Sequence, residues 1–218
     1  MILLSHIIDS ETPTYGNRDK IIIEESSCIA DGASANSSKW VFFTNHLGTH
    51  IDMPKHFFDD GASLTDIPLD FWFSDKVQLI DIPLDKAVLI NDTLLFEYVN
   101  IKTEVLIIRT GYEKYRHNDK YWNDNPGLSA NLGIWLRTNR PNIKMVGFDF
   151  ISLTSWINKE KGKKAHQAFL NPNGEGHAIC IIEDMKLNEI NFDIESIIVS
   201  PLFVKNTNGG PVTVFAQY

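Results

Sequence analysis

The segment His46-Leu-Gly-Thr-His-Ile-Asp52 constrains this chain more than any other feature of its sequence. Two imidazoles and a carboxylate lie within seven residues, and a third imidazole, His56, follows four positions later. Neutral imidazole and carboxylate oxygen are ligands that zinc and manganese accept. We therefore treat the segment as a candidate metal site. The alternative is that these side chains are ordinary surface or hydrogen-bonded core residues.

A metal site places a demand on the backbone of this segment. Bonds of about 2.1 Å require ligand atoms roughly 3 to 3.5 Å apart. A fully extended strand would separate His46 and His50 by about 13 Å. A helix would bring the two together but would turn Asp52 to another face, and the β-branched Thr49 disfavours it. A bend at Gly48, which has no Cβ, can gather all three side chains. The segment is thus predicted to be a bent strand-to-loop connection.

Composition limits the classes of protein that the chain can belong to. Its 218 residues, 43% of them hydrophobic, are enough for one core and one domain spanning 1–218. The net charge of −8 argues against a nucleic-acid partner, and the basic run Lys159–Lys164 is predicted to be a solvated loop. No apolar run approaches the roughly 18 residues of a membrane span, and the apolar start is too short for a signal peptide. Two distant cysteines indicate reduced thiols and a cytoplasmic location.

Short β-rich runs recur along the chain and helical patterns are fewer. Ser129–Asn139 has helical apolar spacing, with Ser129 as a possible cap and Gly133 as a weak interior position, and Leu94–Val99 is a shorter helical candidate. This mixture predicts a single α/β or α+β domain. The predicted strands are Ile21–Glu24, Trp40–Thr44, Val77–Ile82, Val105–Arg109, Met145–Phe148, Ala178–Ile182, Ile197–Val199 and Val212–Phe215.

The last predicted strand belongs to a predicted hairpin. Asn208-Gly209-Gly210 lies between Leu202–Val204 and Val212–Phe215, and Asn-Gly is a strong turn signal. We therefore expect a closing hairpin at the end of the chain.

Further site residues are suggested by where the predicted strands end. Arg109 and Asp149 each follow a strand and are candidate walls of a site, or else strand-end pairing and capping residues. Glu183 closes a second apolar run, where a carboxylate is costly unless it is paired or bound to a cation. It is a candidate ligand, or an exposed residue of a following helix. His166 and His177 are the other candidate ligands in this half of the chain.

The chain also resembles a known family. Asn45-His-Leu-Gly-Thr-His-Ile-Asp-Met-Pro-Lys-His56 closely resembles the HxGTHxDxPxH signature of the bacterial kynurenine formamidase and cyclase family of metal-dependent hydrolases. Motifs similar to those of the family follow its order through most of the chain. They are Thr12-Pro-Thr-Tyr-Gly16, Leu106-Ile-Ile-Arg-Thr110, Val146-Gly-Phe-Asp-Phe-Ile-Ser152, Ala165-His-Gln-Ala-Phe-Leu170, Ile182-Glu-Asp-Met-Lys-Leu187 and Gly210-Pro-Val212.

The resemblance implies a fold and a set of metal ligands. The fold is an α/β single domain of mixed β-sheet with a few helices, of the swivelling β/β/α kind. One or two divalent ions are implied, zinc being expected and manganese the alternative. His46, His50, Asp52 and Glu183 would surround a first ion, and the two carboxylates would bridge to a second ion held by His166. The His166–Glu183 spacing is longer than usual in the family, so His177 remains a rival ligand.

The resemblance further implies a reaction and a partner. His56 would be the catalytic acid/base, a fourth metal ligand being the alternative, and Tyr15 would contact the substrate. The implied reaction is hydrolysis of N-formylkynurenine to kynurenine and formate by metal-bound hydroxide. Hydrolysis of a cyclic amide such as isatin, hydrolysis of a lactone, and a non-catalytic metal-binding module remain alternatives. The family also implies a homodimer. Thr154 departs from a frequent aspartate of the family, so substrate contacts can differ there.

Overall fold

The computed structural model describes residues 1–41, 44–91 and 93–218. The predicted mixed α/β fold is confirmed, with three α-helices in this part of the chain. The strands are β1 (Ile2–Leu3), β2 (Ile22–Ser27), β3 (Ser37–Val41), β4 (His50–Asp52), β5 (Phe73–Ser74), β6 (Val77–Asp81), β7 (Leu89–Ile90), β8 (Val105–Arg109), β9 (Gly127–Leu128), β10 (Met145–Phe148), β11 (Cys180–Glu183), β12 (Ser196–Pro201) and β13 (Gly209–Gln217). The helices are α1 (Lys120–Asn123), α2 (Ala130–Asn139) and α3 (Lys159–Leu170).

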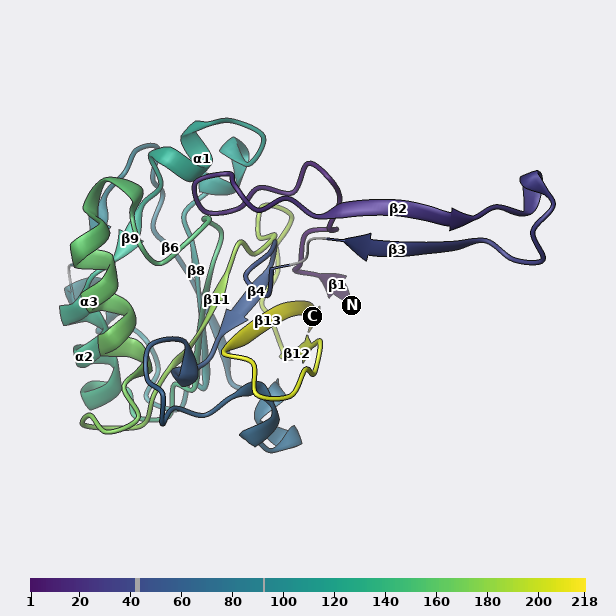
Figure 1. The fold of residues 1–218 in the computed structure, drawn as a ribbon. Helices are drawn as coiled ribbons and strands as arrows, with labels where there is room; N and C mark the ends of the chain where they lie inside the picture. Colours follow the sequence, from purple (N-terminus) through teal and green to yellow (C-terminus); the bar gives the residue numbers. More distant parts are fainter. Residues whose placement is uncertain (42–43, 92) are drawn as a thin grey trace.

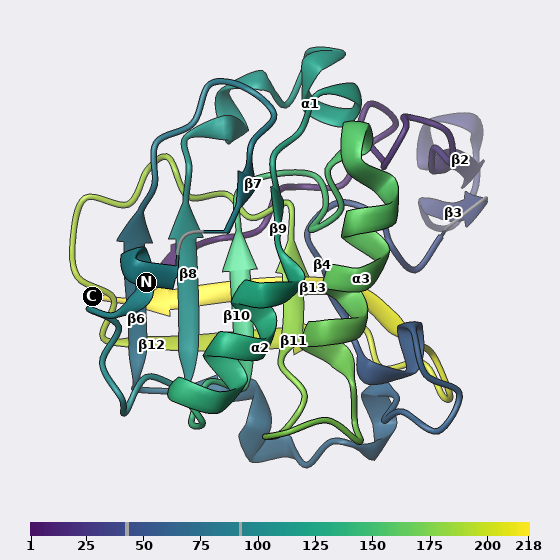
Figure 2. The same ribbon diagram turned by 90° about the vertical axis from the view of Figure 1, so that its left-hand side faces the viewer.

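One large mixed sheet organises the molecule, in the order β5-β12-β13-β4-β11-β10-β8-β6, with β1 also paired to β13. Strands β6, β8, β10 and β11 are parallel, whereas β4 is antiparallel to both β11 and β13. Figure 2 shows that β12 and β13 run across the direction of the parallel strands, so the sheet curls back behind them. The short strand β4 therefore joins the two halves of the sheet.

Two cores fill the space on either side of the parallel strands. Alternate residues of β8 point into opposite cores, Leu106 and Ile108 into one and Val105 and Ile107 into the other. The first core lies under α2 and α3, which cover one face of the sheet in Figure 2. The second lies between the parallel strands and the curled-back β12 and β13. Strands buried on both faces read as continuous apolar runs, which explains why their positions are visible in the sequence.

Helix α2 begins where the sequence predicts. The Ser129 hydroxyl accepts a hydrogen bond from the Leu132 amide at 3.1 Å, and this cap satisfies one of the free donors of the first turn. A Cβ at Gly133 would lie 2.6 Å from the Phe169 ring of α3. The glycine that weakens the helix by propensity therefore allows α3 to approach α2 closely.

Two predictions of local structure are wrong. Lys159–Lys164 is not a solvated loop but the first half of α3, whose apolar residues Ala165, Phe169 and Leu170 are buried while the lysines face outward. Leu94–Val99 is not an α-helix, since only a single 3₁₀ turn forms at Thr93–Phe96. Six residues are too few to offset the cost of nucleating a helix without strong packing.

The closing hairpin exists, but its turn is misplaced in the prediction. Strand β12 ends at Pro201 and β13 begins at Gly209, so residues 202–208 form the loop and both glycines lie inside β13. A Cβ at Gly209 would lie 2.5 Å from the Ile51 carbonyl oxygen of β4. The glycine thus serves close strand packing, which a turn signal mimics in the sequence.

An arm formed by β2 and β3 projects far from the body of the molecule (Figure 1). Its residues are almost all exposed, including Ile22, Ile23 and Trp40. The predicted strand Trp40–Thr44 begins in β3, and its residues 42–43 lie outside the described part of the chain. No helix in the described ranges is long and apolar enough to cross a membrane.

Candidate metal centre

The bent segment brings its side chains together as predicted. Gly48 has a φ of +61°, in the left-handed region that favours glycine. Beyond the bend, His50 and Asp52 lie two residues apart on β4, so both point to the same face while Ile51 enters the core. His46, before the bend, turns its Nδ1 to within 2.8 Å of Asp52 Oδ1. The rings of His46 and His50 are 5.2 Å apart between centroids.

Glu183 reaches the same point through the sheet register. It is the direct partner of His50 in the antiparallel pair of β4 and β11, and directly opposed residues place their side chains on one face. Its Oε2 is 3.4 Å from His50 Nε2. Its Oε1 accepts hydrogen bonds from the Leu153 amide at 2.7 Å and from the Ser152 hydroxyl at 3.3 Å, which fix the carboxylate.

His166 completes the cluster from the buried face of α3. Its Nε2 lies 3.4 Å from Asp52 Oδ2 and 3.6 Å from Glu183 Oε1. Each carboxylate therefore presents one oxygen to His50 and the other to His166. The rival His177 is elsewhere, with its Nε2 2.7 Å from the Ile143 carbonyl oxygen.

The imidazoles of His46, His50 and His166 each have an inner nitrogen facing the carboxylates and an outer nitrogen held by a neighbour. The outer nitrogen of His50 lies 2.8 Å from the Gly48 carbonyl, and that of His166 lies 3.0 Å from the Gly162 carbonyl. A carbonyl can only accept, so the outer nitrogen carries a proton and the inner nitrogen is the one that can exchange its proton for a metal ion. Metal-bound histidines are oriented in this way by their outer nitrogen.

The donor set fits a divalent metal ion. The donor atoms of His50, Asp52 and Glu183 all lie within 4.8 Å of one another, as do those of His46, Asp52 and His56. The distances of 3.4 to 3.6 Å between nitrogens and oxygens match roughly 3.4 Å expected between ligands of a tetrahedral ion with 2.1 Å bonds.

The electrostatics of the cluster show how strongly it attracts positive charge. Burial alone would lower the pKa of His50, but its hydrogen bond to Glu183 and the charge of Asp52 raise it to about 9. Burial would likewise lower the pKa of His166, but its hydrogen bonds to Asp52 and Glu183 outweigh burial and raise the pKa to about 10. Burial favours neutral carboxyl groups, yet the neighbouring imidazoles hold the pKa of Asp52 well below its usual range and lower that of Glu183. In the metal-free protein, protons on His50 and His166 balance the two carboxylates.

His56 differs from the other three histidines. It ends a 3₁₀ turn, Pro54–His56, and its ring lies 4.3 Å from that of His46 and 5.9 Å from that of His166. Its Nδ1 is buried and has no hydrogen-bond partner in the described part of the chain. Burial lowers the pKa of His56 below 6.5, with the charges of Asp52 and His46 acting in opposite directions.

A cavity of about 470 Å³ opens onto the cluster. Tyr15 and Phe57 line it, and the buried Tyr15 hydroxyl has no partner among the described residues. Burial and the charge of Glu183 raise the pKa of Tyr15 to about 12. Thr154, the departure from the family pattern, also lines the cavity and lies 3.1 Å from His166 Nδ1.

Arg109 and Asp149 do not line this cavity, so their interpretation as site walls is wrong. Arg109 pairs with Asp81 through contacts of 2.6 and 2.9 Å. The Asp149 carboxylate accepts hydrogen bonds from the Thr110 amide and hydroxyl and from the Gly111 amide. Both residues have the structural roles that were the alternative, Arg109 in an ion pair and Asp149 in capping the backbone after β8.

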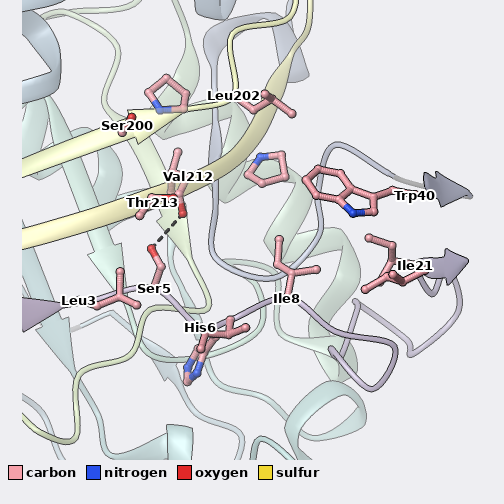
Figure 3. Close-up of a pocket in the computed structure, with 14 residues that line it drawn as sticks. Leu3, Ser5, His6, Ile8, Ile21, Trp40, Ser200, Leu202, Val212 and Thr213 are labelled. Atoms are coloured by element: carbon pink, nitrogen blue, oxygen red, sulfur yellow. Dashed lines mark hydrogen bonds between the residues drawn. The ribbon is translucent and has the colours of Figure 1, made fainter. Parts of the chain in front are cut away.

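A second cavity, of about 490 Å³, lies at the base of the arm (Figure 3). Its walls are mostly apolar and include Ile8, Ile21 and Trp40 on one side and Leu202 and Val212 on the other. None of the described residues that line it is a carboxylate, so it lacks the ligand set of the cluster. We call it the arm groove.

Two asparagines beside the cluster have no counterpart in the sequence prediction. Asn45 and Asn208 both contact His46 Nε2 at 3.2 Å. Asn45 could have been suspected because it precedes the first histidine. Asn208 was assigned to a turn, and nothing in its local sequence indicates that β13 lies against β4.

The cluster is a candidate metal centre on a mixed sheet, and comparisons with known proteins place this combination in a family. The model of the family described as "Putative cyclase" matches residues 2–155, and the chain belongs to that family. An uncharacterised protein of Haemophilus influenzae is 36% identical over 110 residues, which are 49% of this chain and 78% of that protein. The kynurenine formamidase of Bacillus cytotoxicus is 25% identical over 209 residues, covering 96% of this chain and 93% of that one.

Solved structures share the fold. Isatin hydrolase A from Labrenzia aggregata has a TM-score of 0.78 at 21% identity, covering 99% of this chain and 92% of that one. A potential metal-dependent hydrolase with cyclase activity has a TM-score of 0.75 at 17% identity, covering 99% and 96%. These similarities support an enzyme of the hydrolase class.

Proposed function

We propose that this chain is a metal-dependent amide hydrolase, an arylformamidase that converts N-formylkynurenine to kynurenine and formate. The observation that carries the proposal is the convergence of three inner imidazole nitrogens on two carboxylates, beside a fourth imidazole, His56, whose Nδ1 has no hydrogen-bond partner among the described residues. The similarity to a kynurenine formamidase along 96% of the chain supports this choice of substrate.

We assign the metal ligands from the geometry of the cluster. His46, His50, Asp52, Glu183 and His166 would hold the metal, as one or two divalent ions. Zinc suits these nitrogen and oxygen ligands, and manganese is the alternative. Such an ion, when bound, polarises a carbonyl group and lowers the pKa of a water molecule towards neutrality.

His56 would move the proton of the reaction. Because its pKa lies below 6.5, the ring is neutral at pH 7 and can accept a proton from the attacking water. The water oxygen bonds to the formyl carbon, the bond from that carbon to nitrogen breaks, and His56 returns the proton to the departing aryl amine. An aryl amine leaves poorly without this proton, so the residue is needed for formamides in particular.

Tyr15 and Phe57 would position the substrate. The Tyr15 hydroxyl stays protonated, since its pKa is about 12, and can donate a hydrogen bond into the cavity. Phe57 stacks on the His166 ring, with centroids 4.8 Å apart, and offers its other surface to an aromatic ring.

A hydrolysis panel tests the proposal. Protein reconstituted with zinc or with manganese is assayed on N-formylkynurenine, on isatin and on simple lactones, with metal-free protein as the control. The proposal predicts the highest kcat/KM for N-formylkynurenine and activity that returns with the metal. Preference for isatin or a lactone would replace the substrate, and inactivity on all three with bound metal would favour a non-catalytic metal-binding module.

A further inference from the structure

The outer nitrogen of His46 has surroundings unlike those of the other two imidazoles. His50 and His166 are held by backbone carbonyls. His46 Nε2 instead lies 3.2 Å from Asn45 Nδ2 and 3.2 Å from Asn208 Oδ1. An amide nitrogen would donate to Nε2 and an amide oxygen would accept from it, so these contacts favour opposite tautomers of the ring.

The backbone decides between the two contacts. Asn45 Nδ2 lies 3.3 Å from the Gly209 carbonyl oxygen, which can only accept, and it also donates to Asn208 Oδ1. An amide nitrogen has two hydrogens, and these two acceptors use both of them. None remains for His46 Nε2. The ring must therefore donate its own Nε2 hydrogen to Asn208 Oδ1, which makes Nδ1 the nitrogen that can bind a metal ion.

Nδ1 faces a position that takes a proton or a metal ion. It lies 2.8 Å from Asp52 Oδ1, which can only accept, so Nδ1 donates a hydrogen to this oxygen in the metal-free protein and would give up that proton to bind a metal. The chain of contacts from the Gly209 carbonyl through Asn45 and Asn208 to His46 thus begins at fixed backbone and ends at a ligand nitrogen. The start of β13 is held close, since a Cβ on Gly209 would lie 3.1 Å from His46 Cε1.

We propose that Asn208, oriented by Asn45, is a positioning residue that holds His46 in the Nε2–H tautomer and so directs the Nδ1 lone pair at the metal. This inference rests on the metal site of the proposed function. It extends that site to the loop 202–208, which no motif of the chain assigns to it.

The test separates the role of Asn208 from metal binding itself. Asn208→Leu removes the acceptor at similar volume, Asn208→Asp keeps an acceptor, and Lys205→Leu is a matched control on the same loop. Zinc affinity is measured by competition with a chromophoric chelator. The His46 tautomer is read in metal-free protein from ¹H–¹⁵N correlations of the imidazole, assigned with His46→Ala.

We expect a proton on His46 Nε2 in the wild type and in Asn208→Asp, and its loss in Asn208→Leu. Zinc affinity should fall about 10- to 100-fold in Asn208→Leu, the usual effect of removing an outer partner of a ligand, and not in the other two. If Asn208→Leu does not fold, Asn208→Ser, whose hydroxyl is too short to reach, takes its place.

Two results would overturn the inference. One is an unprotonated Nε2 in the wild type, and the other is unchanged zinc affinity in Asn208→Leu. A wild-type protein that binds no zinc would instead refute the proposed function, and the tautomer measurement would still decide the role of Asn208.

Discussion

Replacing Arg116 with methionine would leave the buried carboxylate of Asp184 without its guanidinium partner. The guanidinium donates to both oxygens of Asp184, Nε to Oδ1 at 3.0 Å and Nη2 to Oδ2 at 2.9 Å, and the Asp184 side chain is 0% exposed. Removing one partner of a buried pair costs about 3 to 5 kcal/mol. For a chain of this size, each kcal/mol corresponds to about 2 to 4 °C, so the melting temperature should fall by roughly 6 to 20 °C.

The same change should disturb the metal centre. Asp184 follows Glu183 and has a φ of +53°, a left-handed conformation that the bonds from Arg116 and Tyr121 hold in place. If that turn relaxes, the Glu183 carboxylate moves away from His50. We therefore expect lower zinc affinity in Arg116→Met together with the loss of stability.

A matched pair elsewhere in the chain provides the control for this prediction. Arg109 also contacts an aspartate twice, but the Asp81 side chain is 52% exposed, and exposed pairs contribute about 0 to 1 kcal/mol. Urea unfolding of the metal-free proteins avoids stabilisation by bound metal. Adding Asp184→Asn to Arg116→Met should restore part of the stability, because asparagine is neutral and tolerates the left-handed conformation. Equal losses for Arg116→Met and Arg109→Met would refute the reasoning.

Three other predictions follow from the cluster and the arm. Zinc binding at pH 7.5 should release protons and tighten as pH rises, because His50 and His166, with pKa values of about 9 and 10, must lose protons to bind. Calorimetry in buffers of different ionisation enthalpy measures the proton release. Zinc affinity that does not depend on pH would contradict the prediction. Gly48→Val should lower zinc content measured by elemental analysis, since valine resists a φ of +61°, and full stoichiometry would count against the bend. The exposed arm and the apolar arm groove favour the homodimer that the resemblance implies. Light scattering should show a dimer that Trp40→Ser weakens and that Ile134→Ser, a change at an exposed position on α2, leaves intact. A wild-type monomer would refute the predicted dimer.

Much of the site could be predicted because its ligands are concentrated in one segment. The spacing of His46, His50 and Asp52 requires a bend, and only Gly48 offers one. Glu183 was suspected because a carboxylate at the end of a buried run needs a partner, but its pairing with His50 depends on strand register. The roles of His56 and Tyr15 remain predictions.

What the sequence could not supply are contacts between distant elements. The lysines of Lys159–Lys164 resemble a solvated loop when read alone, but they form the exposed face of α3, whose buried face includes Phe169 packed against Gly133 of α2. Asn208 and Gly209 have the local signature of a turn. Their actual role depends on β13 lying against β4, which no short motif encodes.

The central claim is that the cluster binds the metal while His56 moves the proton. Elemental analysis of His56→Ala and Glu183→Gln, beside their turnover of N-formylkynurenine, tests it most directly. We predict that His56→Ala retains its metal and loses about 10²- to 10⁴-fold in turnover, whereas Glu183→Gln loses metal and activity together. Full metal content with undiminished turnover in His56→Ala, or full metal content in Glu183→Gln, would contradict the claim.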